Sequence, residues 1–132
     1  MLTLPSFHDG YLDGVLLSEN KGAHLFVRTQ ENRRFTIVLK GLKALEISSF
    51  WSGNIIFDLI LVSPEALTNE TVQQAYPHCL SPEENQRRLE KAKEQKLSAL
   101  EISSSYGAEC TALFRDVHVL PDYVLPAFHR TT

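Results

Sequence analysis

The stretch FHDGYLDGV, residues 7–15, concentrates side chains that could bind a metal ion. Imidazole and carboxylate groups are common ligands of transition metals, and here they come from His8, Asp9 and Asp13. A calcium loop of the EF-hand type is excluded. A loop starting at Asp9 would place Tyr11 at its third position and Asn20 at its twelfth, where an oxygen ligand and a bidentate carboxylate are required.

Two interpretations of this stretch remain. Further donors from neighbouring strands, such as His24 or Asp58, could complete a transition-metal site, and a small metal-assisted hydrolase using His8, Asp9, Asp13 and Asp58 is therefore an alternative function. The favoured interpretation is structural, because Asp-Gly dipeptides favour turns. His8 would then anchor the N-terminal arm by bonding a backbone carbonyl, and no metal or other cofactor is expected.

An assembled catalytic set is not found in the sequence. His78 precedes Cys79, but adjacent side chains of an extended chain point apart, so this histidine is poorly placed to activate the thiol. The G-x-S-x-G, glycine-rich phosphate-loop and H-E-x-x-H patterns do not occur. The second cysteine, Cys110, forms no C-x-x-C pair with the first, and both are expected to be reduced thiols. No catalytic residue is predicted, and a non-enzymatic protein is favoured.

Exposed aromatic residues are the candidates for binding a partner. Phe50 and Trp51 lie between serines and a glycine, and Tyr106 precedes Gly107 at a second turn. An aromatic residue on a loop of small residues commonly anchors a protein partner; Trp51 could equally fold over one end of the sheet. The acidic Asp58 lies in an apolar strand and must face solvent, an edge, or a partner such as Arg28 or His24.

These candidates are positioned by strands and one clear helix. Apolar runs separated by turn signals predict antiparallel strands over residues 15–18, 24–29, 35–40, 42–47 and 54–62, the last covered on both faces. A short helix is expected within residues 64–76. Ser81-Pro82-Glu83-Glu84 combines an N-cap, a first-turn proline and a capping box, which predicts a helix over 82–96. Strands resume over 99–103 and 110–120, before an irregular tail over 122–132.

The whole chain, residues 1–132, is expected to form one α+β domain. Its mostly antiparallel sheet would have six or seven strands in a meander, with the helix over 82–96 inserted before the last hairpin. The hexapeptide ALEISS occurs at residues 44–49 and again at 99–104. We interpret the two copies as strands in similar environments, with a duplicated fold as the alternative.

Charge and hydropathy exclude two classes of partner. The formal net charge is −3, from 13 basic and 16 acidic residues, which disfavours nucleic-acid binding. The longest apolar run, residues 55–62, is interrupted by Asp58 and is far shorter than the roughly 20 residues that span a bilayer. The N-terminus has no signal-peptide pattern, so a cytoplasmic location is expected.

Three short segments carry a resemblance. FHDG, GNIIFDL and SSYGAE, at residues 7–10, 53–59 and 104–109, resemble a group of short bacterial proteins of unassigned function, some of which are immunity-like and lie near polymorphic toxin genes. The resemblance implies a β-rich fold with a helix and brings no catalytic residues. A protein-binding module, immunity-like in kind, is therefore the expected function, and a structural homo-oligomer is a third possibility.

Overall fold

A single antiparallel sheet forms the body of the protein. The structure, a computed structural model, describes residues 4–76, 78 and 81–122. Eight strands pair in the order β4-β7-β6-β5-β1-β2-β3-β8. Their bounds are β1 Tyr11–Ser18, β2 Gly22–Arg28, β3 Arg34–Lys40, β4 Ala44–Ser48, β5 Asn54–Val62, β6 Ser98–Tyr106, β7 Glu109–Phe114 and β8 Asp116–Pro121. The α+β class and the antiparallel sheet are as predicted.

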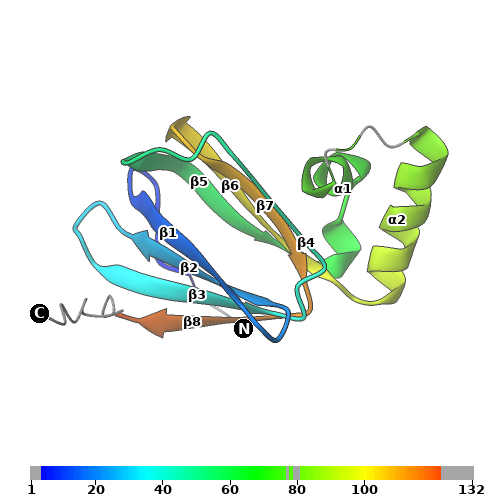
Figure 1. Cartoon of the computed structure of the whole chain (residues 1–132), viewed down its shortest axis with the longest axis horizontal. Coiled ribbons are helices and arrows are strands. Elements are labelled where there is room, and N and C mark those ends of the chain that lie inside the picture. Colours follow the sequence, from blue (N-terminus) through cyan, green and yellow to red (C-terminus); the bar gives the residue numbers. More distant parts are fainter. Residues whose placement is uncertain (1–3, 77, 79–80, 123–132) are drawn as a thin grey trace, which may run out of the picture.

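The sheet folds over on itself to make two layers. Only two residue pairs, Tyr11 with Ile55 and Leu12 with Asn54, join β1 to β5 in the strand ladder. Figure 1 shows β5, β6, β7 and β4 as one layer and β1, β2, β3 and β8 as the other. The space between the two layers holds the main hydrophobic core.

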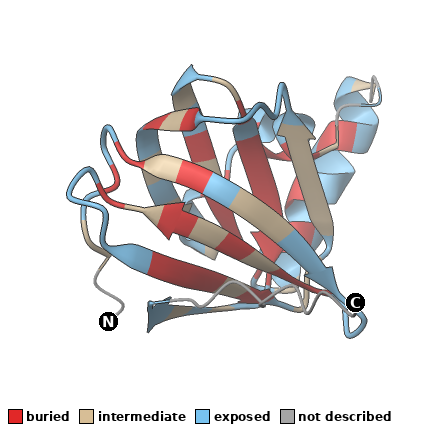
Figure 2. Ribbon diagram, turned by 60° about the vertical axis from the view of Figure 1, so that its left-hand side comes forward, coloured by how far each residue is buried: buried red, intermediate tan, exposed pale blue. Residues whose placement is uncertain are grey.

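Alternate residues of the strands fill this core, because successive side chains of a strand point to opposite faces. The first layer contributes Leu100, Ile102, Cys110, Ala112 and Phe114, and the second contributes Ala23, Leu25, Val27, Phe35, Ile37 and Leu39. Buried residues recur along the strands of both layers, whereas most residues of the connecting loops are exposed or half-buried (Figure 2). The side chains on the outer face of each strand are therefore the ones that could contact a ligand or a partner.

Two helices and a 3-10 turn connect β5 to β6: η1 Pro64–Ala66, α1 Asn69–Ala75 and α2 Pro82–Glu94. They lie beside the first layer in Figure 1 and bury a second apolar cluster against its outer face: Leu67, Val72, Ala75, Leu89, Ala92, Leu97, Ala99 and Leu113. The hydroxyl of Ser81 accepts the Glu84 backbone N–H at 3.2 Å, and Pro82 is the first helical residue. The predicted helix start is confirmed.

The strand count and order differ from the prediction of six or seven strands in a meander. The run 110–120 forms two strands, because the backbone N–H of Arg115 donates to Lys40 O at 3.0 Å and the chain crosses there between layers. β7 then pairs with β4 and β6, whereas β8 pairs with β3. Beyond residue 122, the predicted tail lies outside the described residues.

The outer side of β5 is covered at one end only, although both faces of this strand were predicted to be covered. Val62 packs with the helices, whereas Phe57 and Ile60 are exposed. Register shifts around Ile56 mark a bulge that leaves Phe57 without a partner in the ladder of β6. A large part of the outer face of the first layer is therefore open.

Candidate functional site

The two ALEISS copies lie in the same register on either side of one strand. Glu46 on β4 and Glu101 on β6 both pair with Thr111 of β7, and the same relation holds for the pairs immediately before and after. β4 and β6 are both antiparallel to β7, so the copies run in the same direction. The identical segments thus present identical side chains to both sides of β7, as expected for strands in similar environments.

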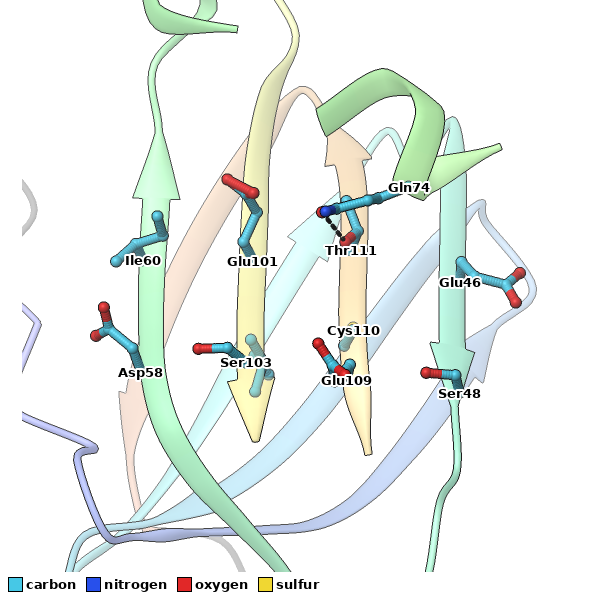
Figure 3. Close-up of a pocket in the computed structure, with 11 residues that line it drawn as sticks. Glu46, Ser48, Asp58, Ile60, Gln74, Glu101, Ser103, Glu109, Cys110 and Thr111 are labelled. Carbon is cyan, nitrogen blue, oxygen red and sulfur yellow. Dashed lines mark hydrogen bonds between the residues drawn. The ribbon is translucent and has the colours of Figure 1, made fainter. Parts of the chain in front are cut away.

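Three cross-strand rows make up the outer face of this layer. The row beneath the helices is apolar and consists of Ala44, Leu113, Ala99 and Val62. The second row consists of Glu46, Thr111, Glu101 and Ile60, and the third of the pairs Ser48–Glu109 and Ser103–Asp58. The second and third rows line a groove of about 450 Å³ together with Gln74 of α1 (Figure 3). We call this the acidic groove.

Each of the four strands contributes one carboxylate to the groove: Asp58 from β5, Glu101 from β6, Glu109 from β7 and Glu46 from β4. Successive carboxylates alternate between the two rows (Figure 3). Among the residues that the structure describes, the groove lining includes no Lys, Arg or His, and no salt bridge involves these four side chains. The groove therefore carries uncompensated negative charge.

Burial raises the pKa of Glu101 above its ordinary value, and the nearby carboxylate of Glu70 raises it further. A hydrogen bond with the Thr71 side chain lowers this pKa. At the helix side of the groove, α1 is bonded to β7, because the hydroxyl of Thr111 donates to Gln74 Oε1 at 3.4 Å. A cation that approached Glu101 would stabilise the ionised form of its carboxyl group.

Cys110 borders the same groove but belongs to the core. Burial, together with the negative charge of Glu46, raises the pKa of its thiol to about 12. Because the thiolate is the nucleophilic form, this cysteine is unsuited to nucleophilic catalysis near neutral pH. Cys79, whose activation by His78 was not expected from the sequence, lies outside the described residues.

The three aromatic candidates lie on two chain segments next to the groove. Phe50 is 49% exposed, Trp51 61% and Tyr106 58%. The loop 49–53 directly follows groove residue Ser48, and the turn 106–108 directly precedes groove residue Glu109. We call Phe50, Trp51 and Tyr106 the aromatic rim, because their segments border the groove at the end farther from α1 (Figure 3).

A buried amide ties the two rim segments together. Asn54, 2% exposed, accepts through Oδ1 the backbone N–H groups of Trp51 at 2.8 Å and Ala108 at 2.9 Å. Its Nδ2 donates to Trp51 O at 2.7 Å and Leu12 O at 3.2 Å. Sequence reasoning missed this residue, although an Asn directly after Ser-Gly is a common way to bond local backbone groups.

The predicted polar cluster is divided among three environments. His8 Nδ1 donates to Phe57 O at 2.6 Å, and its Nε2 lies 3.4 Å from the Asp9 carboxylate, so His8 anchors the N-terminal arm as predicted. Asp13 instead binds the Arg28 guanidinium, at 2.5 and 3.0 Å. Asp58 lies exposed in the acidic groove. Within residues 4–76, 78 and 81–122, no group of three or more His, Cys, Asp or Glu residues is arranged to hold a metal ion.

The two Asp-Gly dipeptides have different roles. Asp9 adopts a positive φ of 60° in a turn, and a Cβ at Gly10 would lie 2.1 Å from Arg28 O, so only glycine fits there. The second dipeptide, predicted to be another turn, lies inside β1, where the register with β2 shifts between Leu12 and Gly14. A β-bulge replaces the turn, because the strand begins before this dipeptide and pairs on both sides of it.

Comparisons of the chain with protein-family models, curated proteins and solved structures find no match. In the described part of the chain, no helix has the length and apolar character needed to cross a membrane. Function is therefore inferred from the aromatic rim and the acidic groove.

Proposed function

We propose that this protein is a non-enzymatic protein-binding module whose aromatic rim contacts the partner. The observation that carries this proposal is the arrangement around Asn54. One buried side chain joins the loop that bears Trp51 to the turn that follows Tyr106. Three exposed aromatic side chains are thereby presented on two segments with a fixed relation.

Aromatic side chains are enriched among the residues that dominate binding energy in protein interfaces. Their segments here are held by buried hydrogen bonds, so little backbone order would have to be gained on binding, and preorganisation of this kind favours affinity. Phe57, also exposed, adds apolar surface on β5 and packs edge-on against the ring of His8. An aromatic surface next to a charged groove, on segments tied together by Asn54, fits a protein partner better than a small metabolite.

More specifically, we propose an immunity-like role, in which the protein partner is a toxin. Two of the three segments that resemble short bacterial proteins, some of them immunity-like, overlap or adjoin the aromatic rim. Residues 53–59 contain Asn54, and residues 104–109 contain Tyr106 and the turn that Asn54 bonds. One of these segments therefore contains the rim residue Tyr106, and the other contains the amide that ties the two rim segments together.

The test is partner capture with matched variants. Affinity purification from the source organism, followed by mass spectrometry, identifies bound proteins, and the dissociation constant is then measured with the purified partner. We expect Trp51→Ala to weaken binding about 30-fold, the effect of losing about 2 kcal/mol at an interface hot spot. Leu17→Ala removes a side chain that is 64% exposed on β1 and should leave binding unchanged. Equal binding by both variants, or no partner captured by the wild-type protein, would contradict the proposal.

A further inference from the structure

We propose that the acidic groove binds an extended basic segment of the protein partner, with Lys or Arg at alternate positions. This inference rests on the proposed function and specifies the chemistry of the partner. The surface in question is the part of the β4-β7-β6-β5 face that the helices leave uncovered. Its occupant follows from the charge of this face and from the spacing of its carboxylates.

Charge complementarity selects a basic occupant. Four strands each present one carboxylate to the groove, and the groove lining contains no basic side chain among the described residues. The hydroxyl of Thr111 lies between Glu46 and Glu101 in the second row, and Ser48 and Ser103 pair with Glu109 and Asp58 in the third. Carboxylates and hydroxyl oxygens together accept the N–H groups of ammonium and guanidinium ions, and charge-assisted hydrogen bonds are stronger than neutral ones.

The spacing of the carboxylates matches an extended chain. Neighbouring strands lie about 4.8 Å apart, so the backbones of β4 and β5, which bear Glu46 and Asp58 at the two ends of the series, are separated across the sheet by about 14 Å. The carboxylates of these two residues turn outward from the series (Figure 3). Diagonal neighbours in adjacent strands lie about 7–8 Å apart. In an extended segment alternate side chains repeat every 6.7 Å or so, and three of them at i, i+2 and i+4 span about 13 Å. The alternate side chains of a basic segment that lies across the four strands can therefore place cations between successive carboxylates.

The groove and the aromatic rim can serve one partner. Ser48 and Glu109, in the third row, are the groove residues that directly adjoin the two rim segments in the sequence. At the other end α1 closes the groove, where Gln74 bonds Thr111 (Figure 3). A segment lying across the four strands in the groove would thus have the helices along one side and the rim along the other, and the rest of the partner would cover Phe50, Trp51 and Tyr106.

The test uses fluorescence anisotropy with labelled, end-blocked peptides at low ionic strength. The probe alternates lysine and serine over eight residues. Its controls are a peptide of the same composition with its four lysines contiguous, and spermine as an unlabelled competitor. We expect the alternating peptide to bind at least fivefold more tightly than the contiguous one. In an extended chain, contiguous lysines point to both sides and only half of them can face the groove.

Matched variants distinguish binding of the peptide in the groove from its non-specific attraction to an acidic protein. Glu101→Gln with Glu109→Gln removes two groove carboxylates, whereas Glu19→Gln with Glu83→Gln removes two exposed ones outside the groove. The groove variant should weaken binding of the alternating peptide at least tenfold, and the control variant less than twofold. Equal binding of the two peptides, equal effects of the two variants, or displacement by spermine at a concentration equal to that of the peptide would overturn the proposal.

The same variants distinguish this inference from the function on which it rests. If the groove variant binds the captured partner as the wild-type protein does, while Trp51→Ala fails to bind, the rim is the binding surface and the groove proposal is wrong. If Trp51→Ala and the groove variant both weaken binding while Leu17→Ala does not, both proposals are supported. Circular dichroism of each variant confirms that it is folded.

Discussion

The side-chain oxygen of Asn54 accepts the backbone N–H of Ala108 at 2.9 Å, across 54 positions of the sequence. The same oxygen accepts the N–H of Trp51. Two segments that are distant in sequence therefore depend on one amide for their relative position. We therefore expect the two segments that bear the aromatic rim to lose order when the Asn54 side chain is removed.

Replacing this amide tests that dependence. Asn54→Ala removes four hydrogen bonds and leaves buried backbone groups without partners, each at a cost of about 1–3 kcal/mol unless water reaches it. We expect a loss of about 2–5 kcal/mol in the free energy of unfolding, measured by urea denaturation, with faster hydrogen exchange at Trp51 and Ala108. Asn20→Ala, at an exposed turn, is the control. A loss below 1 kcal/mol would contradict the role of Asn54.

Gly107 packs directly against this amide. Its φ is +90°, and a Cβ there would lie 2.4 Å from Asn54 Oδ1. Gly53 also has a positive φ, of +133°, but a Cβ there would meet nothing within 4 Å. Gly53→Ala should therefore cost only backbone strain, about 1–3 kcal/mol, and Gly107→Ala should cost at least about 1 kcal/mol more because it also displaces the amide. Thermal and urea denaturation compare them, and equal losses would show that the contact with Asn54 is unimportant.

The raised pKa of Glu101 links stability to pH. Its carboxyl group holds its proton in the folded state at pH values where the unfolded chain has already released it, because burial disfavours the charged form. This residue therefore makes the free energy of unfolding fall as pH rises from 4.5, the ordinary pKa, through the folded-state pKa. Glu101→Gln should remove that fall and be more stable than the wild-type protein at neutral pH, with the advantage shrinking below pH 4.5. Urea denaturation at a series of pH values measures this, with Glu19→Gln as the exposed control, and parallel curves for wild type and Glu101→Gln would refute it.

The buried thiol of Cys110 should resist alkylation in the folded protein. With its pKa raised to about 12, the thiolate fraction at pH 8 is about one in ten thousand, before the lack of access is counted. In a Cys79→Ser background, labelling by iodoacetamide should follow global unfolding and accelerate only as urea unfolds the chain. Rapid labelling of the native protein at pH 8 would mean that the β7 backbone opens locally.

Local signals were sufficient where the interactions are local. Ser81, Pro82 and Glu84 lie within four positions, and the helix that they predict begins where expected. The anchoring of the N-terminal arm by His8 was also anticipated, because a histidine beside a turn readily reaches a carbonyl, although the identity of that carbonyl, Phe57, was not predictable.

Features that depend on strand order were beyond sequence reasoning. The run 110–120 has no strong break, and its division at Arg115 follows from pairing of β8 with β3 in the other layer. The acidic groove exists because β7 inserts between β4 and β6, which brings Glu46 and Glu101 to the same partner, Thr111. Asn54 was missed because two of its hydrogen-bond partners, Leu12 and Ala108, are 42 and 54 residues away.

Site-specific photo-cross-linking in living cells of the source organism tests the central claim most directly, because it reports which surface touches a partner. Benzoylphenylalanine replaces Phe50 on the rim or Leu120 on β8, two side chains that are each 49% exposed. We expect a discrete protein adduct from position 50 and none from position 120, with the adduct lost when Trp51→Ala is added. The same adduct from both positions, or an adduct from position 120 alone, would contradict the assignment of partner binding to the aromatic rim.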